Sequence, residues 1–194
     1  MSGDRQNLEI RAAVELRTAG GRLEGYASVF NQETDLRGFR EVVAPGAFSH
    51  TLKSGGDVLA LYGHDYNQVL GRRGAGTLEL REDAHGLAFS IDPPATSLGR
   101  DLLVSVQRGD VAGASFGFVV EKERWAFPEN QTPHRTIEQV ELLEISLTAM
   151  PAFPQTSVAL RSLQRARGRS GAGGTEPLAR IRARAWLETV RLRR

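Results

Sequence analysis

Hydrophobic and polar residues alternate over short stretches in the first half of the chain, which predicts β-strands. The clearest is Leu23–Phe30, where LEGYASVF alternates and is rich in β-forming residues. Turn-forming residues at 31–38 and at Pro45-Gly46 interrupt the pattern. Further strands are predicted just before Pro45-Gly46 and at Asp57–Tyr62, Val69–Gly71, Gly76–Arg81 and Gly86–Asp92, with a brief helical turn at Ala47–Leu52.

One helix is predicted at Leu98–Arg108. Leu98, Leu102 and Val106 recur every four residues and form one apolar face. Thr96 or Ser97 can cap the beginning of this helix, and Gly109 ends it.

Two longer segments follow the helix. Residues 111–123 have the pattern of a long strand, and residues 125–135 form a polar loop with two prolines. Thr136–Leu147 also alternates; helix is the competing interpretation, but its β-branched residues and the prolines after it favour a strand. About seven strands and one strong internal helix predict an α+β domain built on a β-barrel.

The C-terminal part of the chain differs in composition from the rest. From Arg161 onward there are ten arginines and two acids, so this part carries a net charge of +8 and the remaining residues carry −6. We therefore expect a domain at residues 1–162 and an Arg-rich tail at 163–194, with a flexible linker and an amphipathic helix after Pro177. A basic tail favours an anionic partner, while the acidic body argues against nucleic-acid binding by the body itself.

The absence of cysteine excludes several classes of chemistry. With no Cys among 194 residues there is no disulfide framework, thiolate metal site, iron–sulfur cluster or cysteine nucleophile. The hydrophobic content of 40% is enough for a folded core. No apolar run is long enough to span a membrane, and residues 1–11 lack the apolar segment of a signal peptide. The sequence therefore predicts a soluble intracellular protein without membrane contact.

One serine lies in a motif known from another hydrolase class. Residues 113–117 (GASFG) match G-x-S-x-G, the nucleophile elbow of α/β hydrolases. That elbow needs a strand before the serine, a helix after it and a triad histidine further along the chain. Here a helix precedes Ser115, a strand follows it, and the later histidine, His134, lies in the predicted loop. On its own the motif is therefore interpreted as a coincidence.

A nucleophilic serine also needs a base and a group that orients the base. Four histidines are available: His50, His64, His85 and His134. His64 ends an apolar strand in LYGHD, so a rigid element can aim its ring, whereas Asp65 would point to the opposite face. From the residues alone, a plain residue at a strand end is the favoured explanation of His64.

Glu144 is the acid with the most unusual surroundings. It lies between Leu143 and Ile145 in the predicted strand, where a carboxylate is costly unless it has a hydrogen-bonding partner. An imidazolium that forms during catalysis is one such partner. Glu138 and Glu141 are interpreted as solvent-facing.

Several segments together resemble one family: LEGYASVFN, EVVAPGAF, YGHD, RDLLVSVQRGDVAGASFGF and ELLEISLTAMPAFPQT. Over about Leu23 to Leu160, the chain is similar to the prohead (capsid maturation) serine proteases of tailed phages and of phage-like gene transfer agents. The fold of that family resembles the herpesvirus assembly protease (assemblin), a β-barrel surrounded by helices. By position in these motifs, the resemblance implies a catalytic triad of His64, Ser115 and Glu144, where the herpesvirus relatives have a second histidine as the third member.

The resemblance also implies a serine endopeptidase that needs no metal or organic cofactor. Its substrates would be the major capsid protein with its scaffolding segment, and the protease itself, inside the procapsid in the bacterial cytoplasm. Self-association is expected, with the oligomeric state left open and a dimer as one form, and nucleic-acid binding is expected only through the basic tail. The tail is either a docking or autocleaved segment or a plain basic extension.

Two other functions stay open at this point. The first is a catalytically silent capsid-assembly or scaffolding protein of the same fold. The second is a binding module whose Arg-rich tail contacts nucleic acid, although the chain has no platform of aromatic residues on which bases would stack.

Overall fold

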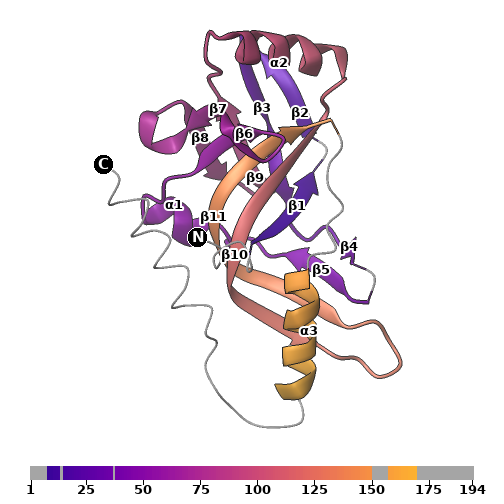
Figure 1. Cartoon of the computed structure of the whole chain (residues 1–194). Helices are drawn as coiled ribbons and strands as arrows, with labels where there is room; N and C mark the ends of the chain where they lie inside the picture. Colours follow the sequence, from indigo (N-terminus) through magenta and orange to yellow (C-terminus); the bar gives the residue numbers. More distant parts are fainter. Residues whose placement is uncertain (1–7, 14, 37, 150–156, 170–194) are drawn as a thin grey trace.

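The computed structural model describes residues 8–13, 15–36, 38–149 and 157–169. Within them, the strands pair as two sheets of seven and four strands, accompanied by three α-helices and one short 3₁₀ helix (Figure 1). This is the mixed α+β class that the hydrophobic pattern predicts. The described part of the chain holds eleven strands where about seven were expected, and they form two sheets.

The seven-stranded sheet is organised around one long antiparallel hairpin. Its strands are β1 (Glu9–Ala13), β10 (Gly113–Ala126), β11 (His134–Thr148), β5 (Arg40–Val43) and β4 (Thr34–Asp35) in spatial order, with β6 (Leu59–Tyr62) on β11 and β7 (Asp65–Arg72) on β6. β5 and β6 both pair with β11 in parallel, at different places along its length. The pairing of β6 with β11 brings two segments 85 residues apart into contact, and it positions the site described below.

The four-stranded sheet is antiparallel throughout. Its strands are β2 (Glu15–Ala19), β3 (Arg22–Val29), β9 (Gly86–Ile91) and β8 (Leu78–Glu82) in spatial order. Gly25 and Gly86 are needed here because a Cβ on either would overlap a backbone carbonyl oxygen of the neighbouring strand.

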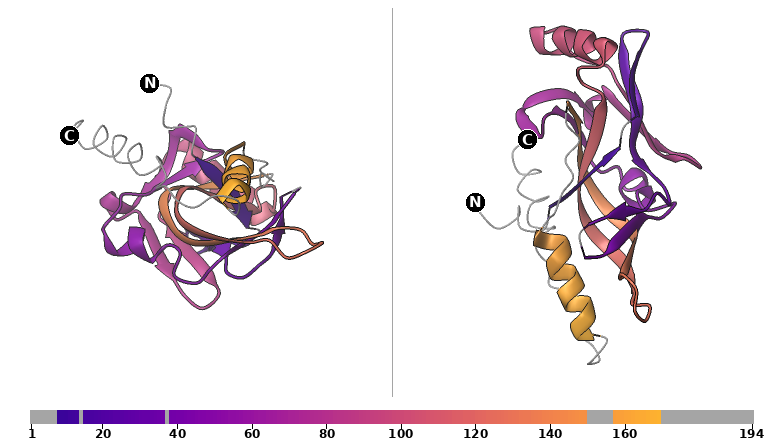
Figure 2. Two further views of the ribbon diagram at one scale, coloured as in Figure 1. Left: turned by 90° about the horizontal axis from the view of Figure 1, so that it is seen from below. Right: turned by 90° about the vertical axis from the view of Figure 1, so that its right-hand side faces the viewer.

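Within the residues that the structure describes, three α-helices and one 3₁₀ helix accompany the sheets. They are α1 (Ser49–Lys53), the 3₁₀ helix η2 (Arg73–Ala75), α2 (Ser97–Arg108) and α3 (Ser157–Arg169). Figure 2 shows α2 and α3 at opposite ends of the long β10–β11 hairpin. α2 begins and ends as predicted: Thr96 Oγ1 accepts a hydrogen bond from the Gly99 N–H, and Gly109 ends the helix with a φ of 81°. None of the helices in the described residues is both long enough and apolar enough to cross a membrane.

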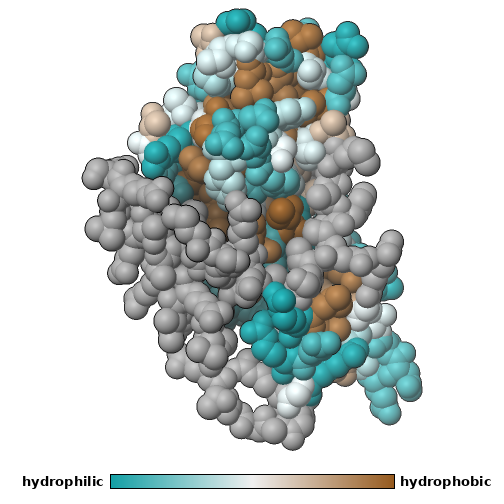
Figure 3. Space-filling model, viewed as in Figure 1, coloured by the Kyte–Doolittle hydropathy of each residue, from teal (hydrophilic) through white to brown (hydrophobic). Residues whose placement is uncertain are grey.

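The main core takes apolar side chains from both sheets and from α2. Phe116 stacks on Phe118 with 4.8 Å between ring centroids and meets Phe48 edge to face at 5.3 Å. Leu102 and Val106 of α2 join the same cluster. In the view of Figure 3, apolar side chains reach the surface near α2, while polar side chains cover much of α3.

A second, smaller core holds α3 against the sheet. Leu36, Phe39, Ala159 and Leu163 are buried together, and the Trp125 ring packs on Phe39 with 5.0 Å between centroids. The expected boundary between residues 162 and 163 lies inside α3. Ala159 and Leu163, on either side of it, pack into the same cluster. The linker and helix expected further along the tail lie outside the described residues, except for residues 166–169, which belong to α3.

The buried face of β1 is charged. Arg11 and Arg135 of β11 together pair with Glu9, Glu41 and Glu123, and all of these side chains except Glu123 are almost fully buried. Burial by itself raises the pKa of Glu9, but the hydrogen bond and charge of Arg135, with Arg11, lower it below its ordinary value. No hydrophobic alternation marks such a strand, which is why the sequence pattern did not predict β1.

The two long strands extend further than expected. The loop predicted at 125–135 is shorter, because Trp125 pairs with Arg135 and Ala126 with His134 in the hairpin. The segment at 136–147, for which helix was the competing interpretation, is part of strand β11.

Candidate active site

Ser115 and Glu144 lie on neighbouring strands and on the same face of the sheet. Across the hairpin, Ser115 of β10 is opposite Ser146 of β11, and Gly117 is opposite Glu144. Directly opposite residues and residues two apart in a strand share a face. Ser115, Ser146, Gly117 and Glu144 therefore lie together on one face of the sheet. Phe116 points the other way, into the core.

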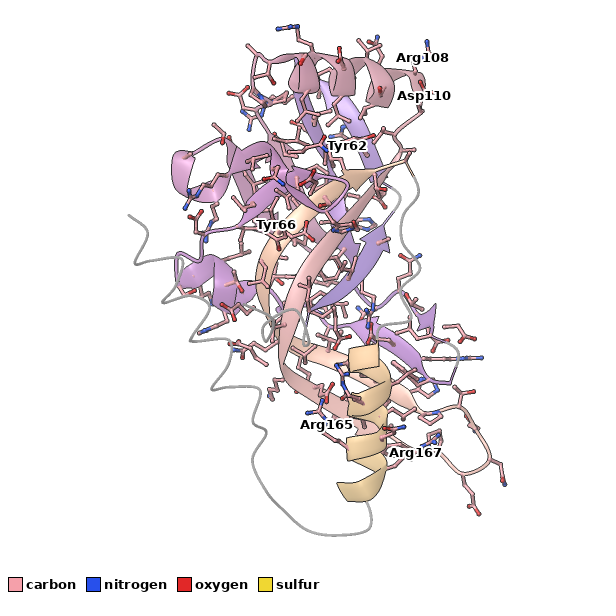
Figure 4. All side chains as sticks on the ribbon, in the orientation of Figure 1. Tyr62, Tyr66, Arg108, Asp110, Arg165 and Arg167 are labelled. Atoms are coloured by element: carbon pink, nitrogen blue, oxygen red, sulfur yellow. The ribbon has the colours of Figure 1, made fainter. Side chains whose placement is uncertain are left out.

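His64 comes from the turn between β6 and β7. Tyr62 pairs with Asp65, so Gly63 and His64 form a two-residue hairpin loop, with φ values of 62° and 61° as in a type I′ turn. A non-glycine residue in this left-handed region is uncommon, and such residues concentrate at functional sites. Figure 4 labels Tyr62 and Tyr66, which flank this turn on β6 and β7.

Parallel pairing with β11 brings this turn to the serine. β6 runs beside β11 from Leu59 opposite Glu144 to Tyr62 opposite Leu147. The turn is then fastened by two backbone donors: the Gly63 N–H donates to the Leu147 carbonyl at 3.0 Å, and the His64 N–H donates to Ser146 Oγ at 3.1 Å.

The three side chains form a continuous hydrogen-bond chain. Ser115 Oγ lies 2.8 Å from His64 Nε2, and His64 Nδ1 lies 2.9 Å from Glu144 Oε1. A carboxylate only accepts hydrogen bonds, so a neutral His64 carries its proton on Nδ1 and donates it to Glu144. Nε2 then has a free lone pair that accepts the Ser115 O–H. This order is that of a nucleophile, a base and a group that orients the base.

Burial differs among these three residues. Ser115 and Glu144 are 0% and 1% exposed, while the His64 side chain is 25% exposed. A molecule in the solvent can therefore contact the imidazole directly, whereas it reaches Ser115 Oγ only when neighbouring groups move.

Comparison with known proteins decides the family. The sequence model of the Caudovirus prohead serine proteases matches residues 6–168. The chain belongs to this family. The prohead protease of Enterobacteria phage HK97 is 33% identical to this family member over 141 residues, which cover 72% of the present chain and 59% of the relative. The chain thus matches less than two thirds of the length of that phage protein.

A solved structure is also similar to this prohead protease family member. The capsid assembly protease of bacteriophage T4 superimposes with a TM-score of 0.45 at 8% identity, over 73% of this chain and 97% of the T4 chain.

The structure brings together all three residues that the resemblance pointed to. It does not bring Asp65 to His64: Asp65 accepts hydrogen bonds from the Asn67 backbone and the Gln68 side chain, which lower its pKa. His85 Nε2 pairs instead with Glu15 at 2.9 Å, and His134 lies 3.5 Å from Glu33.

The other glutamates of β11 have different surroundings. Glu138 forms salt bridges with Lys122 and Arg124, whose hydrogen bonds lower its pKa. Glu141 is half-buried, and burial, followed by the charge of Glu121, raises its pKa. In the described part of the chain, no three histidine or acidic side chains converge in a way that could hold a metal ion.

The G-x-S-x-G match has a different basis here from the one in α/β hydrolases. Ser115 lies within strand β10 and not on a turn from strand to helix. The last glycine of the motif, Gly117, is opposite Glu144, and a Cβ at this position would overlap Glu144 Oε1. The last glycine of the motif thus makes room for Glu144, which is distant in sequence and lies on the neighbouring strand.

Sequence reasoning missed Ser146. Its hydroxyl contacts both Glu144 and the His64 backbone. The available signal was its position two residues after Glu144, which places both side chains on one face of a strand.

Proposed function

We propose that this chain is a serine endopeptidase that cleaves capsid and scaffold proteins, and itself, inside the procapsid during head maturation. The observation that carries the proposal is the hydrogen-bond chain from Ser115 through His64 to Glu144. Membership of the prohead serine protease family supports the same activity.

In the proposed reaction, His64 acts first as a base and then as an acid. Nε2 takes the proton of Ser115 Oγ while Oγ attacks the carbonyl carbon of the scissile peptide, which forms a tetrahedral intermediate. The resulting imidazolium gives its proton to the amine nitrogen as the C–N bond breaks. Water then hydrolyses the acyl-enzyme by the same proton transfers in the second half of the reaction.

Glu144 holds the imidazole in this reaction. Its hydrogen bond to Nδ1 selects the tautomer in which Nε2 is free, and its charge stabilises the imidazolium. Because Glu144 is only 1% exposed, water competes little for this bond.

Membership of the family supports a proposal for the substrates and the place of action. The major capsid protein with its scaffolding segment is the proposed substrate, and the interior of the procapsid in the bacterial host is the proposed location. We include self-association as a dimer and a docking or autocleaved role for the Arg-rich tail in this proposal. Deleting residues 170–194 should reduce co-assembly with capsid protein and leave peptide hydrolysis intact.

A finer fold assignment belongs to the proposal as well. The seven strands of the larger sheet agree in number with the expected β-barrel of the herpesvirus assembly protease type. Superposition of an experimental structure of this chain on a herpesvirus protease tests that assignment.

The burial of Ser115 favours a second candidate function. A serine with no exposed surface is also compatible with a catalytically silent assembly or scaffolding protein of the same fold. The two candidates differ in whether any peptide bond is cleaved.

Intact mass measured over time separates these functions. The purified chain is followed alone and with its capsid protein, beside Ser115→Ala and Glu144→Gln variants. We expect fragments with the unaltered chain, none with Ser115→Ala, and a rate lower by roughly 10³-fold or more with Glu144→Gln. Absence of cleavage in all samples, even within assembled particles, would favour the silent scaffold. The fragment ends identify the cleavage site and supply a peptide substrate for the experiments below.

A further inference from the structure

Ser146 is a fully buried serine at the centre of the site. It lies on β11 directly opposite Ser115, two residues after Glu144, and has no exposed surface. Its hydroxyl donates to Glu144 Oε2 at 2.6 Å and accepts the His64 backbone N–H at 3.1 Å. One hydroxyl therefore touches both members of the histidine–glutamate pair.

The two oxygens of Glu144 have separate partners. Oε1 bonds to His64 Nδ1 and Oε2 to the Ser146 hydroxyl, which together fix the rotation of the carboxylate about its last torsion. Terminal torsions of this type are otherwise broad. A short hydrogen bond to a carboxylate is also among the stronger bonds that a hydroxyl makes.

The second bond of Ser146 acts on the backbone of His64. His64 has a φ of 61°, a conformation that costs free energy for a residue with a side chain. By accepting this N–H, Ser146 Oγ ties the turn to the same strand that carries Glu144. The distance between the imidazole and the carboxylate is thus set through a single side chain.

We propose that Ser146 is a positioning residue for the reaction. It holds the Glu144 carboxylate and the His64 ring in the correct position relative to Ser115. This inference rests on the proposed function and adds a fourth side chain to the three that the family motifs identify. Ser146 does not touch the reacting atoms through its hydroxyl and acts only through Glu144 and His64.

The chain offers a control in Ser162, whose carboxylate partner Glu123 is 28% exposed. This serine of α3 is also buried, at 5% exposed, and its hydroxyl donates to Glu123 Oε1 at the same distance of 2.6 Å. Removing it deletes the same kind of bond on α3, a bond that involves none of the three active-site side chains. Ser162→Ala should leave kcat unchanged.

Kinetics of cleavage of the mapped peptide provide the first test. Ser146→Ala should lower kcat by about 10- to 100-fold with KM nearly unchanged, because the reacting groups are misplaced by a fraction of an ångström. Ser146→Thr keeps the hydroxyl and should restore most of kcat. In a Glu144→Ala background, Ser146→Ala should have a smaller effect, because only its bond to the His64 backbone is then left to lose. An unchanged kcat in Ser146→Ala, or an equal loss with and without Glu144, overturns the proposal.

A spectroscopic test does not depend on activity. The proton on His64 Nδ1 gives a low-field NMR signal when it is held by a carboxylate, and it can be observed in the inactive Ser115→Ala chain. Ser146→Ala should shift this signal or broaden it by exchange with water, while Ser146→Thr and Ser162→Ala should not. If no variant and no unaltered chain cleaves peptide, the proposed function fails, and this signal still decides the role of Ser146: no change in Ser146→Ala overturns it.

Discussion

The carboxylate of Glu144 lies in the space that a side chain on Gly117 would occupy. The two residues are opposite each other in the β10–β11 hairpin, and a Cβ on Gly117 would overlap Glu144 Oε1. Gly117 is not among the described glycines with a left-handed φ, so the requirement is for space and not for backbone freedom. The same oxygen bonds to His64, which makes Gly117 a determinant of the histidine–glutamate contact.

Gly117→Ala should therefore impair catalysis. The overlapping atom is the end of a flexible side chain, so the carboxylate can turn aside, and the bond to His64 is then lost. We expect kcat for the mapped peptide to fall by about 10²-fold. In a Glu144→Ala background, Gly117→Ala should not lower kcat further. If the two substitutions lower kcat additively, this account is wrong.

Burial of Ser115 should limit its reaction with fluorophosphonates. These reagents form a bond between Ser115 Oγ and phosphorus and release fluoride, but Oγ is reached only after the protein opens. The labelling rate should level off as reagent concentration rises, because opening then limits it. Two reagents of different reactivity should reach the same plateau, followed by mass spectrometry with Ser115→Ala as the unlabelled control. A rate that rises linearly for both and scales with reactivity would rule out this opening step.

Arg135 should be essential for stability. It pairs with Glu9, Glu41 and Glu123, and its own pKa is raised because these carboxylates outweigh the effect of burial. Arg135→Met leaves buried carboxylates with too little positive charge and should lower the free energy of unfolding by about 3–5 kcal/mol. Arg124→Met on the neighbouring strand, which removes an exposed salt bridge, should cost less than about 1 kcal/mol. Urea denaturation in the Ser115→Ala chain measures the free energy of unfolding of both variants. If Arg135→Met and Arg124→Met lower it equally, the buried ion pairs of Arg135 do not make the expected contribution to stability.

The same cluster predicts a loss of stability in acid. The pKa of Glu9 in the folded chain lies below its ordinary value of 4.5, so the unfolded chain binds a proton first as the pH falls. The stabilisation from Glu9 is complete at pH values above its ordinary pKa. It is lost as the pH falls through the pKa that Glu9 has in the folded chain. Free energies of unfolding measured from pH 7 to pH 3 should decline less steeply in Glu9→Gln than in the parent. If the free energies of unfolding of the two chains fall in parallel with decreasing pH, Glu9 does not contribute to the loss of stability in acid.

Leu163 should link α3 to the rest of the domain. It is 5% exposed and packs with Phe39 and Trp125, whereas Leu160 of the same helix is 41% exposed. Leu163→Ala should lower the free energy of unfolding by about 2–3 kcal/mol, and Leu160→Ala by less than about 0.5 kcal/mol. If the two variants unfold alike in urea, Leu163 adds nothing to the stability of the domain, which would agree with the expected domain end at residue 162.

The sequence by itself determined the elements whose signals are local. The strand near Leu23–Phe30 and the helix capped by Thr96 were predictable, because alternation, helical periodicity and capping depend on residues close together in the chain. It also carried the family resemblance, and with it His64, Ser115 and Glu144 as candidates.

Only the tertiary structure decided which distant residues meet. Ser115 and His64 are 51 residues apart and His64 and Glu144 are 80 apart, and the parallel pairing of β6 with β11 joins them. The hydrophobic pattern did not predict strand β1, because its buried face carries charged side chains that pair with residues far along the chain. Ser146 and Gly117 likewise acquire their roles from a partner across a strand, since hydrogen-bond partners and available space are properties of packing and not of local sequence.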